Sequence, residues 1–195
     1  MSTVLNAHGV TYLEILFALA VTATVTATAI PWVSGALDDM RTGMAARYVA
    51  SKIGATRLDA VRRSSAVALR FEPSGGDYRF APYGDGNANG VRSAEIRDGV
   101  DPVLGPFERL EDRFAGVRFE LGAGLPDADG LGGTGQDGVR IGTARILTMS
   151  SDGTATSGTL YIRGLRTQYA VRILGVSGRT RMLQYSSRDR SWTSR

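Results

Sequence analysis

The feature that most constrains this chain is a run without a single charge from Ile15 to Val33, which reads ILFALAVTATVTATAIPWV. As an α-helix it would be about 28 Å long at 1.5 Å per residue, close to the roughly 30 Å thickness of a bilayer core. The alternation VTATVTAT has the period of a strand, but an uncharged run of this length favours a helix. Its threonine hydroxyls can bond back to the preceding helical turn, which makes them tolerable in lipid. We therefore expect a helix that spans a membrane.

A secretory signal peptide is the alternative interpretation of this run. Such a peptide normally begins with basic residues and ends in a cleavage site made of small residues. Here Lys and Arg are absent before Arg41, and the apolar run is preceded by Glu14. The pattern therefore favours a retained anchor.

Glu14 needs an explanation, because an unpaired carboxylate at the edge of an apolar helix costs several kcal/mol in hydrocarbon. The residues around it, His8-Gly9-Val10-Thr11-Tyr12-Leu13-Glu14, resemble the processing site of type IV prepilins and of type II secretion pseudopilins. In that pattern a Gly precedes the cut, a hydrophobic residue follows it, and a Glu is the fifth residue after it. Pro31 also lies where this family commonly has a helix-kinking proline.

The resemblance implies a specific processing and assembly chemistry. A prepilin peptidase would remove a leader, residues 1–9, by cutting between Gly9 and Val10, and would methylate the new amine of Val10. The charged amine of one subunit would then pair with Glu14 of its neighbour. Val10 in place of the usual Phe, Tyr12 at a usually aliphatic position and a leader without basic residues depart from the family pattern.

The helical pattern continues after Pro31. Apolar residues recur three to five positions apart with charges between them, namely Leu37, Met40, Met44, Tyr48, Ile53, Leu58 and Val61. We predict one helix from about Thr11 to Arg63, kinked near Pro31, whose methionines belong to a core. The predicted parts are a leader (1–9), a transmembrane or filament-core helix (10–35), its amphipathic continuation (36–64) and a globular β-domain (65–195).

The period changes to two after the helix, as in antiparallel strands with one apolar face. The predicted strands are 66–71, 77–82, 116–121, 139–149, 159–164, 168–174 and 179–185. We therefore predict an α+β fold, with a long N-terminal helix packed on an antiparallel sheet or small β-sandwich.

Several segments of the β-part resemble the GspH/FimT group of minor pilins and pseudopilins. They are SKIGATRLDAVRRSSAVALRF at 51–71, ILTMSSDGTATSG at 146–158, TLYI at 159–162 and QYAVRILGVSGRTRML at 168–183. The resemblance implies a pilin-like fold and a structural subunit of a type II secretion pseudopilus or a type IV pilus. It also implies a single-pass inner-membrane protein with its globular domain in the periplasm, whose partners are the peptidase and other pilin subunits.

The end of the chain is strongly basic. Residues 140–195 carry ten Arg against Asp152 and Asp189, which suggests an anionic partner. Gly178-Arg179-Thr180-Arg181 resembles the G-R-x-R signature of FimT-like minor pilins that bind DNA. The DNA-binding candidates are Arg179, Arg181, Arg188 and Arg190, and a solvated strand face with a frayed tail is the plainer alternative.

Other chemistry has little support. The order D-x-N-x-N-G at Asp85, Asn87, Asn89 and Gly90 is half of a calcium loop, but Ile96 stands at the twelfth position, so a polar turn is favoured. With no Cys and with His8 as the only histidine, thiolate zinc sites and a Ser-His-Asp triad are nearly excluded. We expect no enzyme and no cofactor.

Overall fold

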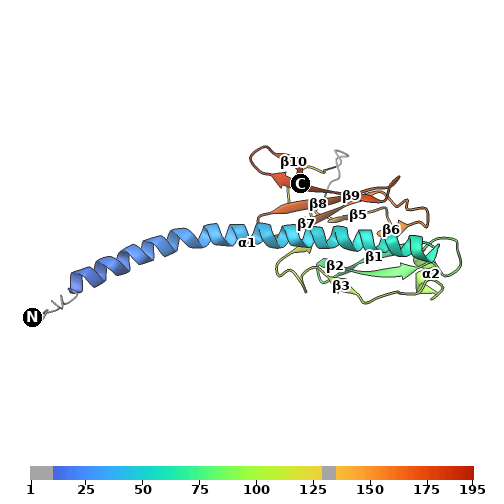
Figure 1. The fold of residues 1–195 in the computed structure, drawn as a ribbon, viewed down its shortest axis with the longest axis horizontal. Coiled ribbons are helices and arrows are strands. Elements are labelled where there is room, and N and C mark those ends of the chain that lie inside the picture. Colours follow the sequence, from blue (N-terminus) through green and yellow to red (C-terminus); the bar gives the residue numbers. More distant parts are fainter. Residues whose placement is uncertain (1–10, 129–134) are drawn as a thin grey trace, which may run out of the picture. The chain divides into compact units, whose positions relative to one another are not determined.

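The computed structural model describes residues 11–128 and 135–195, apart from the side chains of residues 28–32. One helix, α1 (Tyr12–Arg63), runs through the N-terminal third of the chain (Figure 1). The predicted single helix is confirmed. The kink expected near Pro31 lies within residues 28–32, whose side chains are outside the described part of the structure. The chain divides into two compact units after Leu37. We call Asp38–Arg195 the body.

Two antiparallel sheets form the body together with the second half of α1. The first sheet has the order β3-β2-β1-β6, with β1 (Val67–Ser74), β2 (Asp77–Gly84), β3 (Glu108–Arg109) and β6 (Ile146–Met149). The second has the order β10-β9-β8-β7-β4, with β5 also paired to β7. Its strands are β4 (Arg118–Phe119), β5 (Val139–Arg140), β7 (Gly158–Arg163), β8 (Gln168–Leu174), β9 (Arg179–Ser186) and β10 (Ser191–Ser194). A short helix, α2 (Ser93–Arg97), follows β2.

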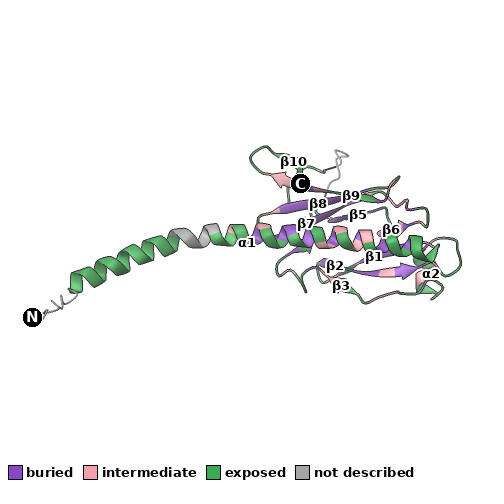
Figure 2. Cartoon of the chain, viewed as in Figure 1, coloured by how far each residue is buried: buried purple, intermediate pink, exposed green. Residues whose placement is uncertain are grey.

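A single main core joins α1 to both sheets, which confirms the predicted α+β class. Ile53 of α1 packs in one cluster with Phe71 of β1 and Val171 of β8, and the inner faces of both sheets are buried (Figure 2). Among the described residues, every buried hydrophobic side chain lies between Ala45 and Leu183. The body therefore holds its own core, and we expect it to fold without the residues before it.

The predicted role of the methionines is wrong. Met40 and Met44 are exposed, as are Leu37, Leu58 and Val61. The buried face of α1 is instead made of small residues and a few aliphatic ones, namely Thr42, Gly43, Ala45, Ala46, Val49, Ile53, Thr56 and Ala60. Small side chains let the helix axis approach the sheets closely, so that the hydroxyl oxygen of Tyr169 would lie 3.2 Å from a Cβ atom added at Gly43. Bulky methionines could not occupy that space.

The predicted strand 139–149 is also wrong, because it is two strands that belong to different sheets. β5 pairs with β7, whereas β6 pairs with β1. Between them Gly142 and Arg145 have φ angles of 52° and 51°, in the left-handed region that interrupts a strand. The alternation of apolar residues continues through this turn because each half faces the same core.

The end of the chain is not frayed, because β10 pairs with β9 and ends one residue before the C-terminus. The indole nitrogen of Trp192 donates to the carbonyl of Pro126 at 2.9 Å. In the part of the chain that the structure describes, no helix is both long and apolar enough to cross a membrane.

Candidate functional site: the apolar helix and the arginines of the second sheet

The first 26 residues of α1, Tyr12–Leu37, present large apolar side chains to solvent. Phe17 is 71% exposed, and the other exposed ones are Tyr12, Leu13, Ile15, Leu16, Leu19, Val21, Val25, Val33 and Leu37. The hydroxyls of Thr22, Thr24 and Thr26 donate to the carbonyl oxygens four residues earlier at 2.7–2.8 Å, as the sequence predicted. This segment therefore offers an apolar surface whose polar groups are satisfied internally.

Glu14 lies in the first turn of α1 and is exposed. Its backbone N–H donates to the hydroxyl oxygen of Thr11 at 3.3 Å, which is half of a capping box. The partial positive charge of the helix N-terminus favours a carboxylate at this position. The described residues provide no ion pair for Glu14, so its charge is available to a partner. Gly9 and Val10, the predicted cleavage site, lie outside the described residues.

The four candidate DNA-binding arginines are all exposed, but they form two separate pairs. Arg179 and Arg181 lie at the start of β9, whereas Arg188 and Arg190 lie in the turn after it. The five steps of strand from Arg181 to Ser186, where β9 ends, already extend over about 17 Å. Within the described part of the chain none of the four forms an ion pair with a carboxylate. The arginines are therefore unpaired, as DNA binding would need, but they do not converge on one patch.

Gly178 in the G-R-x-R motif has a backbone role. It has a φ angle of 60°, and a Cβ atom added there would lie 2.5 Å from the carbonyl oxygen of Gly153 and 2.9 Å from Arg57. Arg57 of α1 in turn donates to the same carbonyl at 3.0 Å. The glycine of the motif is thus explained by packing of the β8–β9 turn against α1.

At the other end of the body, Asp38 binds the β7–β8 turn to α1. Its two carboxylate oxygens accept the backbone N–H groups of Leu165, Arg166 and Thr167 at 2.7, 2.9 and 2.9 Å. Burial by itself would raise the pKa of Asp38, but these donors outweigh it and lower the pKa. Three consecutive N–H groups around one anion hold the turn in a single conformation.

The neighbouring Asp39 fixes β8 and β9 in the same way. Its carboxylate accepts the hydroxyl of Tyr169 at 3.1 Å and the amide of Gln184 at 2.9 Å. The two aspartates therefore attach the first helical turn of the body to the β7–β8 turn and to strands β8 and β9 of the second sheet. Sequence reasoning missed both, because their partners are more than 125 residues away in the chain.

In the candidate calcium loop, the carboxylate that would bind the ion accepts hydrogen bonds from the backbone of the loop itself. The carboxylate of Asp85 accepts the N–H groups of Asn87, Asn89 and Gly90 at 2.8–3.3 Å, and the side-chain amide of Asn89 donates to Glu95. These are the bonds of a polar turn. The described residues contain no group of three or more His, Cys, Asp or Glu side chains that could hold a metal ion.

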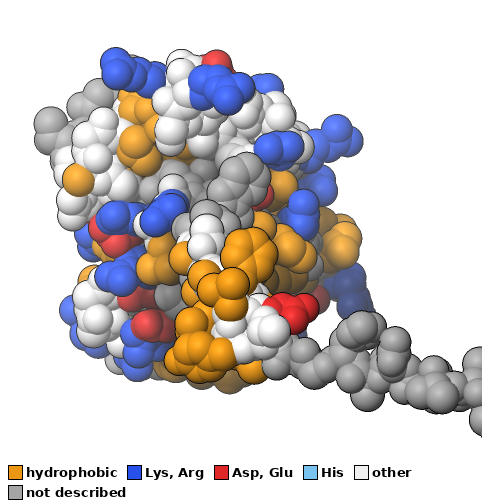
Figure 3. All heavy atoms as spheres, turned by 90° about the vertical axis from the view of Figure 1, so that its left-hand side faces the viewer, with side chains coloured by type: hydrophobic (Ala, Val, Ile, Leu, Met, Phe, Trp, Pro, Cys, Tyr) orange, Lys and Arg blue, Asp and Glu red, His pale blue; other side chains and the backbone are white. Residues whose placement is uncertain are grey.

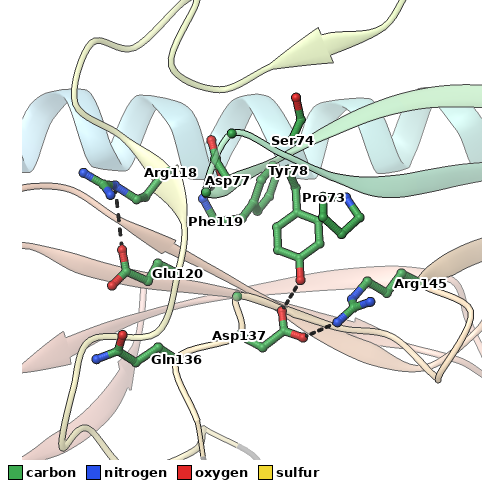
Figure 4. A pocket seen from close by; sticks show the side chains of 13 residues that line it. Pro73, Ser74, Asp77, Tyr78, Arg118, Phe119, Glu120, Gln136, Asp137 and Arg145 are labelled. Carbon is green, nitrogen blue, oxygen red and sulfur yellow. Dashed lines mark hydrogen bonds and ion pairs between the residues drawn. The ribbon is translucent and has the colours of Figure 1, made fainter.

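A pocket opens between the β1–β2 turn of the first sheet and, on the side of the second sheet, β4 and the segment just before β5 (Figure 4). The hydroxyl of Tyr78 donates to Asp137 at 2.7 Å, and Arg145 donates to the same carboxylate at 2.9 Å. Burial and the neighbouring Asp137 raise the pKa of Tyr78 to about 12. Most polar groups here bind one another, so they serve chiefly to join the two sheets.

Comparison with protein-family models, with curated proteins and with solved structures gives no match for this chain.

Proposed function

We propose that this chain is a minor pilin or pseudopilin, a structural subunit anchored in the inner membrane by the first half of α1, with its body in the periplasm. After cleavage between Gly9 and Val10 and N-methylation of Val10, it assembles into a type II secretion pseudopilus or a type IV pilus. In this proposal the fold is pilin-like, and the prepilin peptidase and other pilin subunits are its partners.

One observation carries the proposal, namely the exposed apolar surface of Tyr12–Leu37 in a chain whose body already contains its own core. Such a surface needs lipid or other helices to cover it. The internally bonded threonines suit either environment, because their hydroxyls do not need water. Glu14 is the only charged residue between Gly9 and Asp38, and it has no cation near it in the described residues. An amine from a neighbouring subunit would supply one.

The test is a pair of substitutions at Glu14 in the full chain, expressed in a bacterium that assembles such filaments. Glu14→Gln keeps the size of the side chain and its hydrogen-bonding groups but removes the charge, whereas Glu14→Ala removes both. If the amine pairs with the carboxylate, both variants insert into the membrane and both assemble poorly. Membrane fractionation and filament shearing followed by immunoblotting measure the two steps separately.

The capping role of Glu14 gives a different result, which makes the experiment discriminating. If Glu14 only caps the helix, Glu14→Gln assembles normally, because Gln also serves in a capping box. Thr11→Ala is the matched control, since it removes the cap and keeps the carboxylate. Normal filament incorporation of Glu14→Gln would overturn the assembly role.

DNA capture in a DNA-uptake pilus is a second candidate function, and the unpaired pair Arg179 and Arg181 favours it. Arg181 lies directly opposite Arg172 on β8, so three arginines are close together on the outer face of the second sheet. A DNA titration of residues 36–195 at two salt concentrations tests this function. Binding that weakens steeply with salt and is lost in Arg179→Ala/Arg181→Ala supports DNA capture, and no binding at low salt excludes it.

A further inference from the structure

The antiparallel topology brings two turns of the second sheet together at one end of the body. Tyr169 near the start of β8 is paired with Gln184 near the end of β9. The turn before β8 (164–167) and the turn after β9 (187–190) therefore lie at the same end of the sheet, as Figure 1 shows. Asp38 and Asp39 bind this same end. We call it the Asp38 end.

Exposed arginines gather at the Asp38 end. Arg166 lies in the first turn, Arg188 and Arg190 in the second, and Arg41 lies one helical turn after Asp38. Among the described residues these four side chains form no ion pair with a carboxylate, and Asp189 is the only acidic residue in the two turns. Asp38 and Asp39 are already bound to the body. On the face of the body seen in Figure 3, basic side chains outnumber acidic ones.

An exposed apolar side chain lies among these charges. Leu165 is 77% exposed, although its own N–H is held by Asp38 at 2.7 Å. The position of the turn is fixed further by Gly164, where an added Cβ atom would lie 2.2 Å from the hydroxyl of Thr42. Met40, 62% exposed, is on the adjoining turn of α1. The fold therefore holds a leucine rigidly in solvent beside arginines that have no partner.

The Asp38 end is also where the apolar segment joins the body, because Asp38 follows Leu37 in the chain. If that segment lies in a bilayer, as the proposed function requires, residue 38 cannot be far from the lipid surface. Arginine forks match phosphate oxygens, and a leucine can enter the boundary between headgroups and acyl chains. Arginines close to an anionic membrane surface each favour binding to it.

We propose that the Asp38 end is a membrane-docking surface that binds anionic phospholipid headgroups through Arg41, Arg166, Arg188 and Arg190 and inserts Leu165. This proposal rests on the proposed membrane anchor and goes beyond it, because it assigns the body an orientation on the bilayer before assembly. It also gives a reason for arginines next to an anchor on the periplasmic side, where basic residues are usually scarce.

The test uses the full chain, which contains no cysteine, so that one introduced cysteine can be labelled specifically. A fluorophore is placed at Leu165→Cys, at Val176→Cys on the β8–β9 turn, or at Val21→Cys in the apolar helix. Each protein is reconstituted into vesicles of phosphatidylcholine alone or mixed with phosphatidylglycerol. Both carry nitroxide-labelled lipids, one with the nitroxide on the headgroup, which quenches a fluorophore at the membrane surface, and one with it on the acyl chain, which quenches a fluorophore in the bilayer core.

Docking predicts that the label at 165 is quenched in the anionic vesicles, much less in the neutral ones, and that salt reverses the effect. The label at 176, on a residue that is 94% exposed at the opposite end of the body, stays unquenched in both. Arg166→Gln/Arg188→Gln/Arg190→Gln should lower the ratio of docked to undocked protein by roughly fivefold for each arginine. The matched control, Arg62→Gln/Arg63→Gln/Arg97→Gln, removes the same charge elsewhere and should leave quenching unchanged.

The label at 21 separates this proposal from the one on which it rests. If the label at position 21 is quenched and the label at position 165 is not, the proposed membrane anchor is supported and the docking surface is overturned. If neither is quenched, both proposals fail. Equal quenching at 165 in neutral and anionic vesicles overturns recognition of the headgroup charge. If the triple variant at the Asp38 end and the control triple variant lose quenching equally, the effect comes from net charge alone, and this result also overturns the assignment of docking to the Asp38 end.

Discussion

The contact between Asp38 and the β7–β8 turn makes a quantitative prediction. Asp38→Ala removes an anion that accepts three backbone N–H groups at 2.7–2.9 Å. A hydrogen bond to a charged group contributes roughly 1.5–3 kcal/mol. Because the turn is exposed, water can satisfy part of what is lost, and the variant no longer has to bury a charge. We expect the free energy of unfolding to fall by about 2–4 kcal/mol, well above the effect of an ordinary surface substitution.

Urea denaturation of residues 36–195, followed by circular dichroism, measures this loss. For a domain of this size each kcal/mol lowers Tm by about 2–4 °C. Asp38→Asn keeps one acceptor oxygen and should lose less. Asp59→Asn, on the same helix and exposed, is the matched control and should stay within about 0.5 kcal/mol of the wild type. Hydrogen exchange should show faster exchange at the amides of residues 165–167 in Asp38→Ala.

A loss below about 0.5 kcal/mol for Asp38→Ala, with unchanged exchange at these amides, would refute the reasoning. It would mean that water satisfies the turn as well as the carboxylate does. The rigid presentation of Leu165 would then lose its structural basis.

Gly164→Ala should destabilise the body, because the added Cβ atom would lie 2.2 Å from Thr42 and 2.4 Å from Asp38. Gly54→Ala, whose added Cβ atom would have no other atom within 4 Å, should instead stabilise the body by about 0.5–1 kcal/mol. The urea midpoints of the two variants measure the difference. Tyr78→Phe should cost about 1 kcal/mol through the lost bond to Asp137, and ultraviolet titration of the wild type should find one tyrosine with a pKa of about 12. Burial alone would raise the pKa of Asp38 and of Asp137, but hydrogen bonds to their carboxylates outweigh it and lower both pKa values. The two carboxylates therefore stabilise the fold fully above the unfolded pKa of about 4, and this stabilisation is lost as the pH falls through their folded pKa values. A thermal stability that rises on acidification below pH 4 would contradict this.

Much of the fold could be predicted from local patterns. The uncharged run and the apolar spacing after it determine a single helix to Arg63, and period-two alternation determines most strands, because burial on one side of a regular backbone leaves a periodic trace in the sequence. Glu14 stands out for a similar reason, as a lone charge in an apolar run. The basic C-terminal quarter is likewise evident from composition.

Tertiary structure alone decided which face of α1 is buried, which sheet each strand joins and which arginines lie together. Alanines rather than methionines face the core because the helix packs close to the sheets. β5 and β6 separate because two left-handed residues turn the chain between sheets. The turns that carry Arg166 and Arg188 come to the same end of the body only through the antiparallel pairing of β8 with β9. Periodicity records whether a residue is buried, but the partner that buries it is chosen by contacts between residues far apart in the chain.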